Sequence, residues 1–306
     1  MFLVIFVFLE YKVININYKN INQILKQELK LSARLMHKVI INKLVFLNNK
    51  QVDTRSSVNI GDIVKIDLNY EEENDNIVPI KMNLDILYED DCLLIINKPA
   101  GIAVHPSILH FEDSLSNGVR YYFDSIDLKK KIRPVNRLDL DTSGIIVFAK
   151  NEYIQECLIR QMTINQFKKQ YIAIVSGHLK EKSGLIDLPI TRKENSIIER
   201  CISEKGQNAI TKYEVIKELS SMSVVKCFLE TGRTHQIRVH FMAIGNPLIG
   251  DSLYGSKSSL IDRQALHCYS ISFFHPIAKK VLNITCNLPK DMKNIFEQKK
   301  DNKKEL

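Results

Sequence analysis

Residues 133–150 read Arg-Pro-Val-Asn-Arg-Leu-Asp-Leu-Asp-Thr-Ser-Gly-Ile-Ile-Val-Phe-Ala-Lys, a charged loop that runs directly into an apolar segment. The apolar part, 144–150, has the length and composition of a buried strand. Because loops anchored on rigid strands often carry reactive groups, the polar residues ahead of it are candidate site residues. Asp139 stands near Arg137, so it fits either a nucleophile of low pKa or a salt-bridged structural anchor.

On both sides of this stretch, short apolar strands outnumber helices and do not alternate with them regularly. Helices are expected at 151–165, where Asn151 can act as N-cap, and at 234–244, before Gly245. Strands are expected at 84–89, 92–97, 170–175, 213–216, 224–229, 265–273 and 281–286. This pattern favours an α+β fold with a mixed, mostly antiparallel sheet over a doubly wound fold.

A small basic unit precedes these elements. Two short helices are expected within 19–41, with Ser32 as N-cap of the second, followed by strands at 44–47, 50–52 and 63–68. Residues 19–70 hold nine Lys or Arg and four Asp or Glu, a local net charge of +5. The predicted division of the chain is therefore an N-terminal extension with a strand (1–19), a small domain (20–70), an acidic linker with few packed contacts (71–80), a large domain (81–290) and a Lys-rich tail with a last helix (291–306).

Composition limits the class of protein. The 306 residues carry a net charge of +8, which suits an anionic partner such as nucleic acid or acidic lipid but equally a solvated Lys-rich surface. A hydrophobic share of 45% excludes global disorder. The apolar start, 1–9, is shorter than the roughly 20 residues of a membrane-spanning helix, so a strand is expected there and no membrane partner. Six scattered cysteines without a CxxC pair indicate reduced thiols in a cytoplasmic protein.

Two further stretches carry polar residues of possible chemical use. Arg233, His235 and Arg238 lie where a helix is expected to begin, as in phosphate-binding sites. His235 and His240 are five residues apart and lack an accompanying cysteine or carboxylate, so no metal site is expected. Tyr171 follows Lys168 and Lys169 at the start of a strand, where it fits either the core or a stacking platform for a base.

A glycosidase site built on two carboxylates was the other enzymatic possibility in the loop. Asp139 and Asp141 are only two residues apart, and the chain has no Trp and no evident aromatic platform for a sugar. The pair is therefore a weak candidate for acid–base hydrolysis.

Taken together, four segments in this order resemble the RNA pseudouridine synthases of the large-subunit type. They cover residues 87–106, 133–150, 168–177 and 229–255. The resemblance implies isomerisation of specific uridines to pseudouridine, in ribosomal RNA as the first expectation and in transfer RNA as the second, by a monomer without metal or cofactor. The basic unit is similar to the small αL RNA-binding domain named for ribosomal protein S-four, through residues 31–35, 48–52 and 61–64.

The resemblance also implies roles for individual residues. Asp139 matches the catalytic aspartate, Arg238 the arginine that pairs with it, and Tyr171 the aromatic residue that stacks on the target base. Arg137 matches the residue that fills the gap left by a flipped-out nucleotide. Asn136 stands where many members have His, and it is expected to keep an RNA contact.

Further RNA contacts are expected from Arg233 and His235 in the large domain and from Arg34 and Lys38 in the small unit. The alternative function is a non-catalytic RNA-binding protein on the same fold. The combination of Asp139, Tyr171 and Arg238 argues against that alternative.

Overall fold

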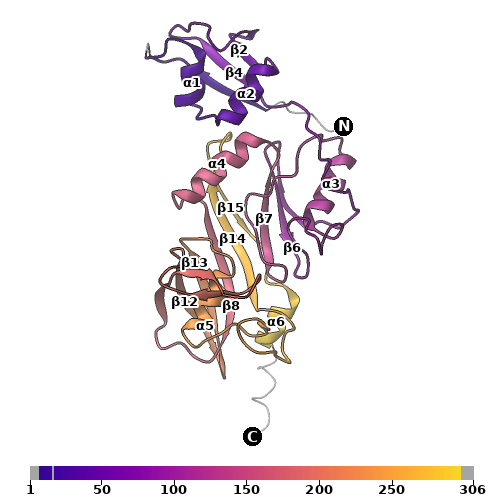
Figure 1. The fold of residues 1–306 in the computed structure, drawn as a ribbon, viewed down its shortest axis with the longest axis vertical. Helices are drawn as coiled ribbons and strands as arrows, with labels where there is room; N and C mark the ends of the chain where they lie inside the picture. Colours follow the sequence, from indigo (N-terminus) through magenta and orange to yellow (C-terminus); the bar gives the residue numbers. More distant parts are fainter. Residues whose placement is uncertain (1–6, 16, 298–306) are drawn as a thin grey trace.

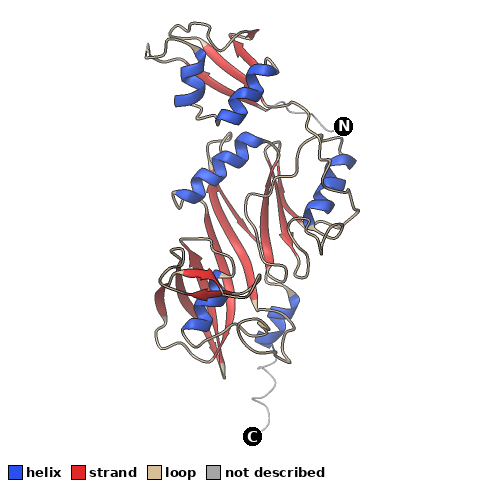
Figure 2. Cartoon of the chain, in the orientation of Figure 1, coloured by secondary structure: helices blue, strands red, loops and turns tan. Residues whose placement is uncertain are grey.

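The computed structural model describes residues 7–15 and 17–297. A small N-terminal unit stands at one end of a longer, β-rich unit, and the two touch near helix α4 (Glu152–Thr163) (Figure 1). Helices lie against the sheets from outside (Figure 2). The α+β prediction with a mixed, mostly antiparallel sheet is confirmed.

The small unit is a four-stranded sheet packed against two helices. Asn20 and Ser32 accept hydrogen bonds from the first turns of α1 and α2 as N-caps, so the prediction for Ser32 is confirmed. Its elements are β1 (Phe8–Lys12), α1 (Ile21–Gln27), α2 (Ala33–Ile41), β2 (Val45–Leu47), β3 (Lys50–Gln51) and β4 (Ile63–Asp67), with strand order β1-β4-β2-β3. β1 pairs with β4 along its whole length, so the predicted separate extension supplies an edge strand to this sheet. Residues 1–6 lie outside the described part.

The large unit is built on one nine-stranded sheet. Its strand order is β5-β6-β7-β14-β8-β13-β12-β9, and β15 pairs with β14. The strands are β5 (Ile86–Glu89), β6 (Leu93–Lys98), β7 (Ser143–Ala149), β8 (Lys168–Ser176), β9 (Ser183–Asp187), β12 (Ile210–Leu219), β13 (Met222–Leu229), β14 (Leu266–Phe274) and β15 (Val281–Thr285). β10 (Ile190–Arg192) and β11 (Arg200–Ile202) form a separate pair. The remaining helices are α3 (Leu115–Ser125), α5 (Gln236–Ala243) and α6 (Lys290–Glu297).

Strand β7 lies inside this sheet, between β6 and β14. Every residue of β7 is buried, as the apolar run 144–150 predicts, and β7 meets β14 in a short parallel contact. Gly144 has φ +118° there, and a Cβ on it would lie 2.2 Å from the Cys268 carbonyl oxygen. Only glycine fits this position, because the backbone approaches too closely for any side chain. The charged loop before β7 thus starts from a rigid support.

The acidic segment 71–76 is not the loose linker that the sequence suggests. The Glu72 side chain is only 4% exposed and forms ion pairs with Lys38 at 2.9 Å and Arg133 at 2.7 Å. Asn74 accepts a hydrogen bond from the Ile132 amide and donates one to the Lys130 carbonyl. The prediction of few packed contacts is wrong, because the acidic residues meet basic partners on both flanking units.

These ion pairs join the two units. Lys38 of α2 also binds Glu152, the first residue of α4, at 2.8 Å. We call Lys38, Glu72, Arg133 and Glu152 the interdomain cluster. Because its members come from the small unit, the connecting segment and the large unit, the cluster ties all three together.

All six cysteines are free thiols. Within residues 7–15 and 17–297, no helix has both the length and the apolar character needed to cross a bilayer. Helix α6 begins at Lys290, close to the expected last helix, and the tail from residue 298 onward lies outside the described part.

Candidate active site

The three polar stretches converge on one cavity beside the loop that precedes β7. The cavity has a volume of about 80 Å³. The loop contributes Asp139, β8 contributes Tyr171, and the start of α5 contributes the arginine and histidine predicted there. Its polar lining comprises Arg137, Asp139, Thr142, Lys169, Tyr171, Arg233, His235, Gln236 and Arg238.

Asp139 faces a fixed guanidinium. Arg238 donates from Nη1 to Asp139 Oδ2 at 3.2 Å, and the Asp139 side chain is 25% exposed toward the cavity. Arg238 also donates from Nε and Nη2 to the two oxygens of Asp251, at 2.7 and 2.8 Å. Asp251 is fully buried, and amides of the following turn donate to it as well. Although burial opposes ionisation of both partners, their pairing raises the pKa of Arg238 and lowers that of Asp251.

His235 approaches the same carboxylate from another side. Its Nε2 lies 3.9 Å from Asp139 Oδ2, and its Nδ1 is hydrogen-bonded to the Tyr254 hydroxyl at 2.8 Å. His235 has φ +58°, an uncommon backbone conformation for a residue other than glycine, where the chain turns into α5. Burial lowers the pKa of His235 despite the nearby Asp139 charge, so its neutral form is favoured at pH 7.

Tyr171 forms part of the cavity wall. It is 5% exposed on β8, so only a small part of the ring is open to solvent. Burial, followed by the neighbouring Cys268 thiol, raises the pKa of Tyr171 well above its ordinary value. The residue is therefore a neutral phenol, which suits stacking on a base better than removal of a proton.

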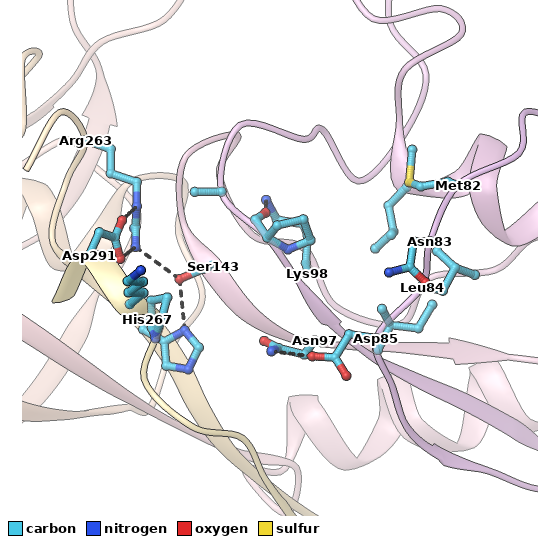
Figure 3. Close-up of a pocket in the computed structure, with 16 residues that line it drawn as sticks. Met82, Asn83, Leu84, Asp85, Asn97, Lys98, Ser143, Arg263, His267 and Asp291 are labelled. Atoms are coloured by element: carbon cyan, nitrogen blue, oxygen red, sulfur yellow. Dashed lines mark hydrogen bonds and ion pairs between the residues drawn. The ribbon is translucent and has the colours of Figure 1, made fainter. Parts of the chain in front are cut away.

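Buried cations support the loop from behind. Lys98, which is 0% exposed, donates from Nζ to the carbonyls of Ile102, Leu140 and Pro99 at 2.7, 2.8 and 2.9 Å. Arg263 donates to the Asp141 carbonyl at 3.0 Å and pairs with Asp291 at 2.7 Å. Both cations line a cavity of about 470 Å³ on that side (Figure 3). The backbone directly after Asp139 is thus held by charged donors.

The ionisation of Lys98 is finely balanced. Burial lowers its pKa to about 7, against the opposing charges of Asp141 and Asp139. Three carbonyl acceptors require three hydrogens on Nζ, and only the ammonium form carries three. The geometry therefore favours the protonated form in the folded protein at neutral pH.

The structure corrects two of the expected RNA contacts. Asn136 is 4% exposed, donates to the Ile145 carbonyl at 3.0 Å and accepts from the Val147 amide at 2.9 Å. Its amide is used to brace the loop against β7 rather than presented to RNA. Lys38 donates hydrogen bonds to Glu72 and Glu152 in the interdomain cluster, so its ammonium is bound to protein carboxylates rather than presented to RNA.

Three of the other predicted contacts remain accessible, while the His235 side chain is only 11% exposed. Arg137 and Arg233 are exposed and line the cavity at Asp139, with Arg233 held by the Asn208 carbonyl at 2.9 Å. Arg34 lies on α2 with a side chain 77% exposed, 3.5 Å from Glu152. The sequence interpretation missed Asp251, Tyr254, Lys98 and Arg263 as supports of the site. The first three lie inside the family-like segments, but their burial has no signal in the sequence.

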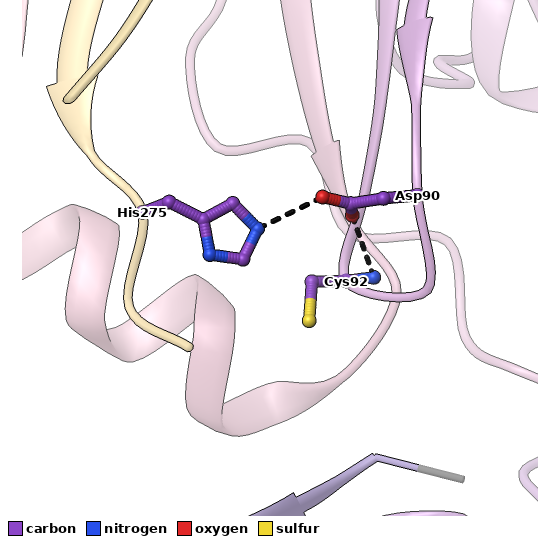
Figure 4. Close-up of side chains that lie close together, drawn as sticks. All are labelled: Asp90, Cys92 and His275. Carbon is purple, nitrogen blue, oxygen red and sulfur yellow. Dashed lines mark hydrogen bonds and ion pairs between the residues drawn. The ribbon is translucent and has the colours of Figure 1, made fainter. Parts of the chain in front are cut away.

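One group of possible metal ligands lies elsewhere, at Asp90, Cys92 and His275 (Figure 4). His275 Nδ1 accepts from the amides of Ile277 and Ala278, so its proton is on Nε2 and is donated to Asp90 at 2.9 Å. Burial raises the pKa of the Cys92 thiol to about 12. The residues present do not fit a metal, because no free imidazole nitrogen or thiolate remains for coordination.

Fold and site define an enzyme with a fixed aspartate in a basic cavity. Residues 92–243 match a family model described as RNA pseudouridylate synthase. The RNA pseudouridine synthase YhcT of Bacillus subtilis is 41% identical over 274 residues, which cover 89% of this chain and 90% of that protein. The ribosomal large subunit pseudouridine synthase D of Blochmanniella floridana is 35% identical and covers 83% of this chain and 85% of its own.

A solved structure shares the fold at lower identity. Human RNA pseudouridylate synthase domain containing 1 is 23% identical, with a TM-score of 0.56 over 72% of this chain and 95% of its own. The chain belongs to the RNA pseudouridylate synthase family. It is an RNA pseudouridine synthase, an isomerase acting on uridine in RNA.

Proposed function

We propose that Asp139 is the catalytic aspartate of this isomerisation. The observation that carries the proposal is the Asp139 carboxylate itself, one side held by Arg238 at 3.2 Å and the other open to the cavity. A carboxylate in this position is preorganised toward a reacting sugar, since its partner is buried and cannot swing away. The glycosidase alternative has no comparable support, because Arg263 holds the backbone of Asp141 on the far side of the loop.

The reaction conserves every atom of the nucleotide. The N1–C1′ bond breaks, the uracil turns, and a C5–C1′ bond forms. The hydrogen on C5 leaves as a proton, and N1 gains one. Asp139 stabilises the positive charge that develops at C1′ as N1 departs. No electrons are exchanged with an outside partner, so the proposed chemistry needs no cofactor.

Neighbouring side chains take supporting roles in this proposal. Arg238 forms an ion pair with Asp139 and orients its carboxylate. Tyr171 stacks on the target base through the part of its ring that faces the cavity. Arg137 occupies the gap left in the RNA when the nucleotide is flipped out.

The proposed substrate is ribosomal RNA, with transfer RNA as the second candidate. Support comes from the relatives named as ribosomal large subunit pseudouridine synthases. Arg233, His235 and Arg34 contact the RNA in this proposal, and the basic small unit grips it away from the target uridine as an S-four-like domain. The protein acts as a monomer in the cytoplasm.

The test is conversion of an unmodified large-subunit ribosomal RNA transcript, read by pseudouridine mapping, with transfer RNA transcripts in parallel. Conversion by wild-type protein and none by Asp139→Asn is the expected result. Binding without conversion would instead favour the non-catalytic RNA-binding alternative.

The role of the small unit is tested by deleting residues 1–70. The deletion should weaken RNA binding and flatten its salt dependence, because each lost phosphate contact removes roughly 0.7–0.9 from the slope of log K against log salt. An unchanged slope combined with a large fall in melting temperature would mean that the unit only stabilises the large one.

A further inference from the structure

Lys169 carries an ammonium group into the active-site region without a protein partner. It precedes Tyr171 by two residues on β8, so both side chains lie on the same face of the sheet, and both line the cavity at Asp139. The side chain is partly buried. In the described part of the chain, no acceptor or carboxylate is placed to bind its Nζ. Burying an ammonium without a partner is unfavourable, so Lys169 does not stabilise the fold through its charge, and the charge is available for a ligand.

Gly232 borders this ammonium. A Cβ on Gly232 would lie 3.4 Å from Lys169 Nζ. This is an ordinary contact distance, and Gly232 and Lys169 both line the cavity. The loop before α5 thus leaves Nζ reachable by a ligand.

The surroundings of Lys169 have an excess of positive charge. A second cavity, of about 540 Å³, adjoins the first and shares Arg137, Asp139, Lys169, Gly232 and Arg233 with it. Arg200 and His105 also line it. Among the residues that line this second cavity, Asp139 carries the carboxylate, and that carboxylate forms an ion pair with Arg238. Burial lowers the pKa of Lys169, and the neighbouring group that opposes this is the Cys268 thiol rather than a carboxylate.

We propose that Lys169 binds a phosphate group flanking the target uridine and so draws the flipped nucleotide toward Asp139. The inference rests on the proposed function, because it takes the nucleotide that enters beside Asp139 as the ligand. A nucleotide in a chain brings a phosphate on either side, and a compact ammonium forms strong charge-assisted hydrogen bonds with phosphate oxygens. Lys169 is a positioning residue, since its contact is with a group that does not react.

The test compares Lys169→Met with Lys169→Arg and with Lys168→Met. Lys168 is the exposed neighbour on the opposite face of β8, so its variant removes the same charge from the same strand. Dissociation constants for a large-subunit ribosomal RNA transcript are measured between 50 and 400 mM KCl, together with single-turnover conversion and melting temperature.

Lys169→Met should weaken binding by about ten-fold or more and reduce the salt slope by roughly 0.7–0.9. Lys169→Arg should recover much of the affinity, and Lys168→Met should stay near wild type. The melting temperature of Lys169→Met should equal or exceed that of wild type, because the variant removes an unpaired, partly buried charge. Wild-type affinity and slope in Lys169→Met would overturn the proposal, as would a loss of binding explained by a lower melting temperature.

A second arm separates phosphate from base. Once the modified uridine is mapped, a methylphosphonate on one flanking side should weaken wild-type binding and cause no further loss in Lys169→Met. If the binding losses from the methylphosphonate and from Lys169→Met add in full at both flanking positions, Lys169 binds another group, such as a uracil carbonyl. That result would overturn the inference. If Asp139→Asn still converts uridine while Lys169→Met shows the predicted binding loss, the catalytic assignment fails and the phosphate contact stands.

Discussion

Two of the three guanidinium nitrogens of Arg238 bind Asp251, at 2.7 and 2.8 Å. This bidentate pair fixes the plane of the guanidinium, since both oxygens of a fully buried carboxylate are engaged. One nitrogen remains for Asp139, at 3.2 Å. Arg238 is thus oriented chiefly by Asp251 and meets Asp139 at the edge of an already rigid group, which leaves the second oxygen of Asp139 free for substrate.

Asp251→Asn should therefore impair activity without altering any residue of the cavity lining. The amide keeps one acceptor for Arg238 but removes the buried counter-charge, and breaking such a pair costs about 3–5 kcal/mol. We expect a lower melting temperature and a large fall in the single-turnover rate. Activity near wild type would mean that Asp139 alone suffices to hold Arg238.

The same pair predicts a pH dependence of stability. The folded-state pKa of Asp251 is lowered, so the pair stabilises the protein above the ordinary pKa of 3.8 and loses that contribution as pH falls through the folded-state value. Urea unfolding measures the free energy of unfolding of wild type and of Asp251→Asn. The difference between the two should be constant near pH 7 and should shrink below about pH 4. If the free energies of unfolding of the two proteins differed by the same amount down to the pH of acid unfolding, the lowered pKa of Asp251 would be contradicted.

Asp139→Asn should abolish pseudouridine formation while leaving the melting temperature and RNA affinity nearly unchanged. The substitution preserves volume and removes the charge, and the side chain is partly exposed rather than part of the core. Pseudouridine mapping of the transcript checks activity, and a filter-binding titration checks affinity. Conversion above background would remove Asp139 from the catalytic role.

Lys98→Met should loosen the loop, since the Leu140 carbonyl next to Asp139 loses its donor. The folded-state pKa of Lys98 is about 7, below its ordinary 10.5, so the unfolded chain binds more protons between these values. Wild-type stability relative to Lys98→Met should therefore rise as pH increases from about 7 toward 10. Denaturant unfolding across this range measures the difference, and a pH-independent difference would show that the pKa of Lys98 is not lowered.

Glu72→Gln should destabilise the whole protein, because it leaves Lys38 and Arg133 with less counter-charge in a buried setting. A loss of about 3–5 kcal/mol is expected in the free energy of unfolding. Glu73→Gln, one residue along and exposed, is the matched control and should be close to neutral. Equal melting temperatures for the two variants would mean that the interdomain cluster adds no stability.

Truncations test the same cluster. A chain that starts at Glu71 keeps the carboxylate that pairs with Arg133, whereas a chain that starts at Ile77 loses it. The longer fragment should melt at a higher temperature, although both lack Lys38. The reverse order would place the stabilising contacts outside residues 71–76.

Patterns along the sequence predicted the elements better than their contacts. The apolar run 144–150, the caps Ser32 and Asn151, and the strands around Asp90-Asp91 are local signals, and the structure confirms them. The convergence of Asp139, Tyr171 and Arg238 followed from resemblance to a family, because no local rule brings residues 99 positions apart to one point.

Burial of charged and polar side chains was the recurring source of error. Lys38, Glu72 and Asn136 are polar residue types that usually face solvent or RNA. Nothing in the neighbouring sequence shows that they form ion pairs or hydrogen bonds inside the protein. Lys98 stands at the end of an apolar strand, where a lysine usually marks its exposed end, yet it is enclosed by carbonyls. Whether such a residue is buried or exposed depends on the partners that the fold brings next to it, since an ion pair joins elements that are distant in sequence.

The interdomain cluster also bears on how the enzyme chooses among uridines. With Lys38, Glu72, Arg133 and Glu152 locked together, the span from the basic helix α2 to Asp139 is a fixed length rather than an adjustable tether. An RNA that touches both ends must offer a uridine at that distance in its own folded shape. Under the proposed RNA contact of the small unit, a stem lengthened or shortened by a few base pairs would therefore carry an otherwise suitable uridine out of reach of Asp139.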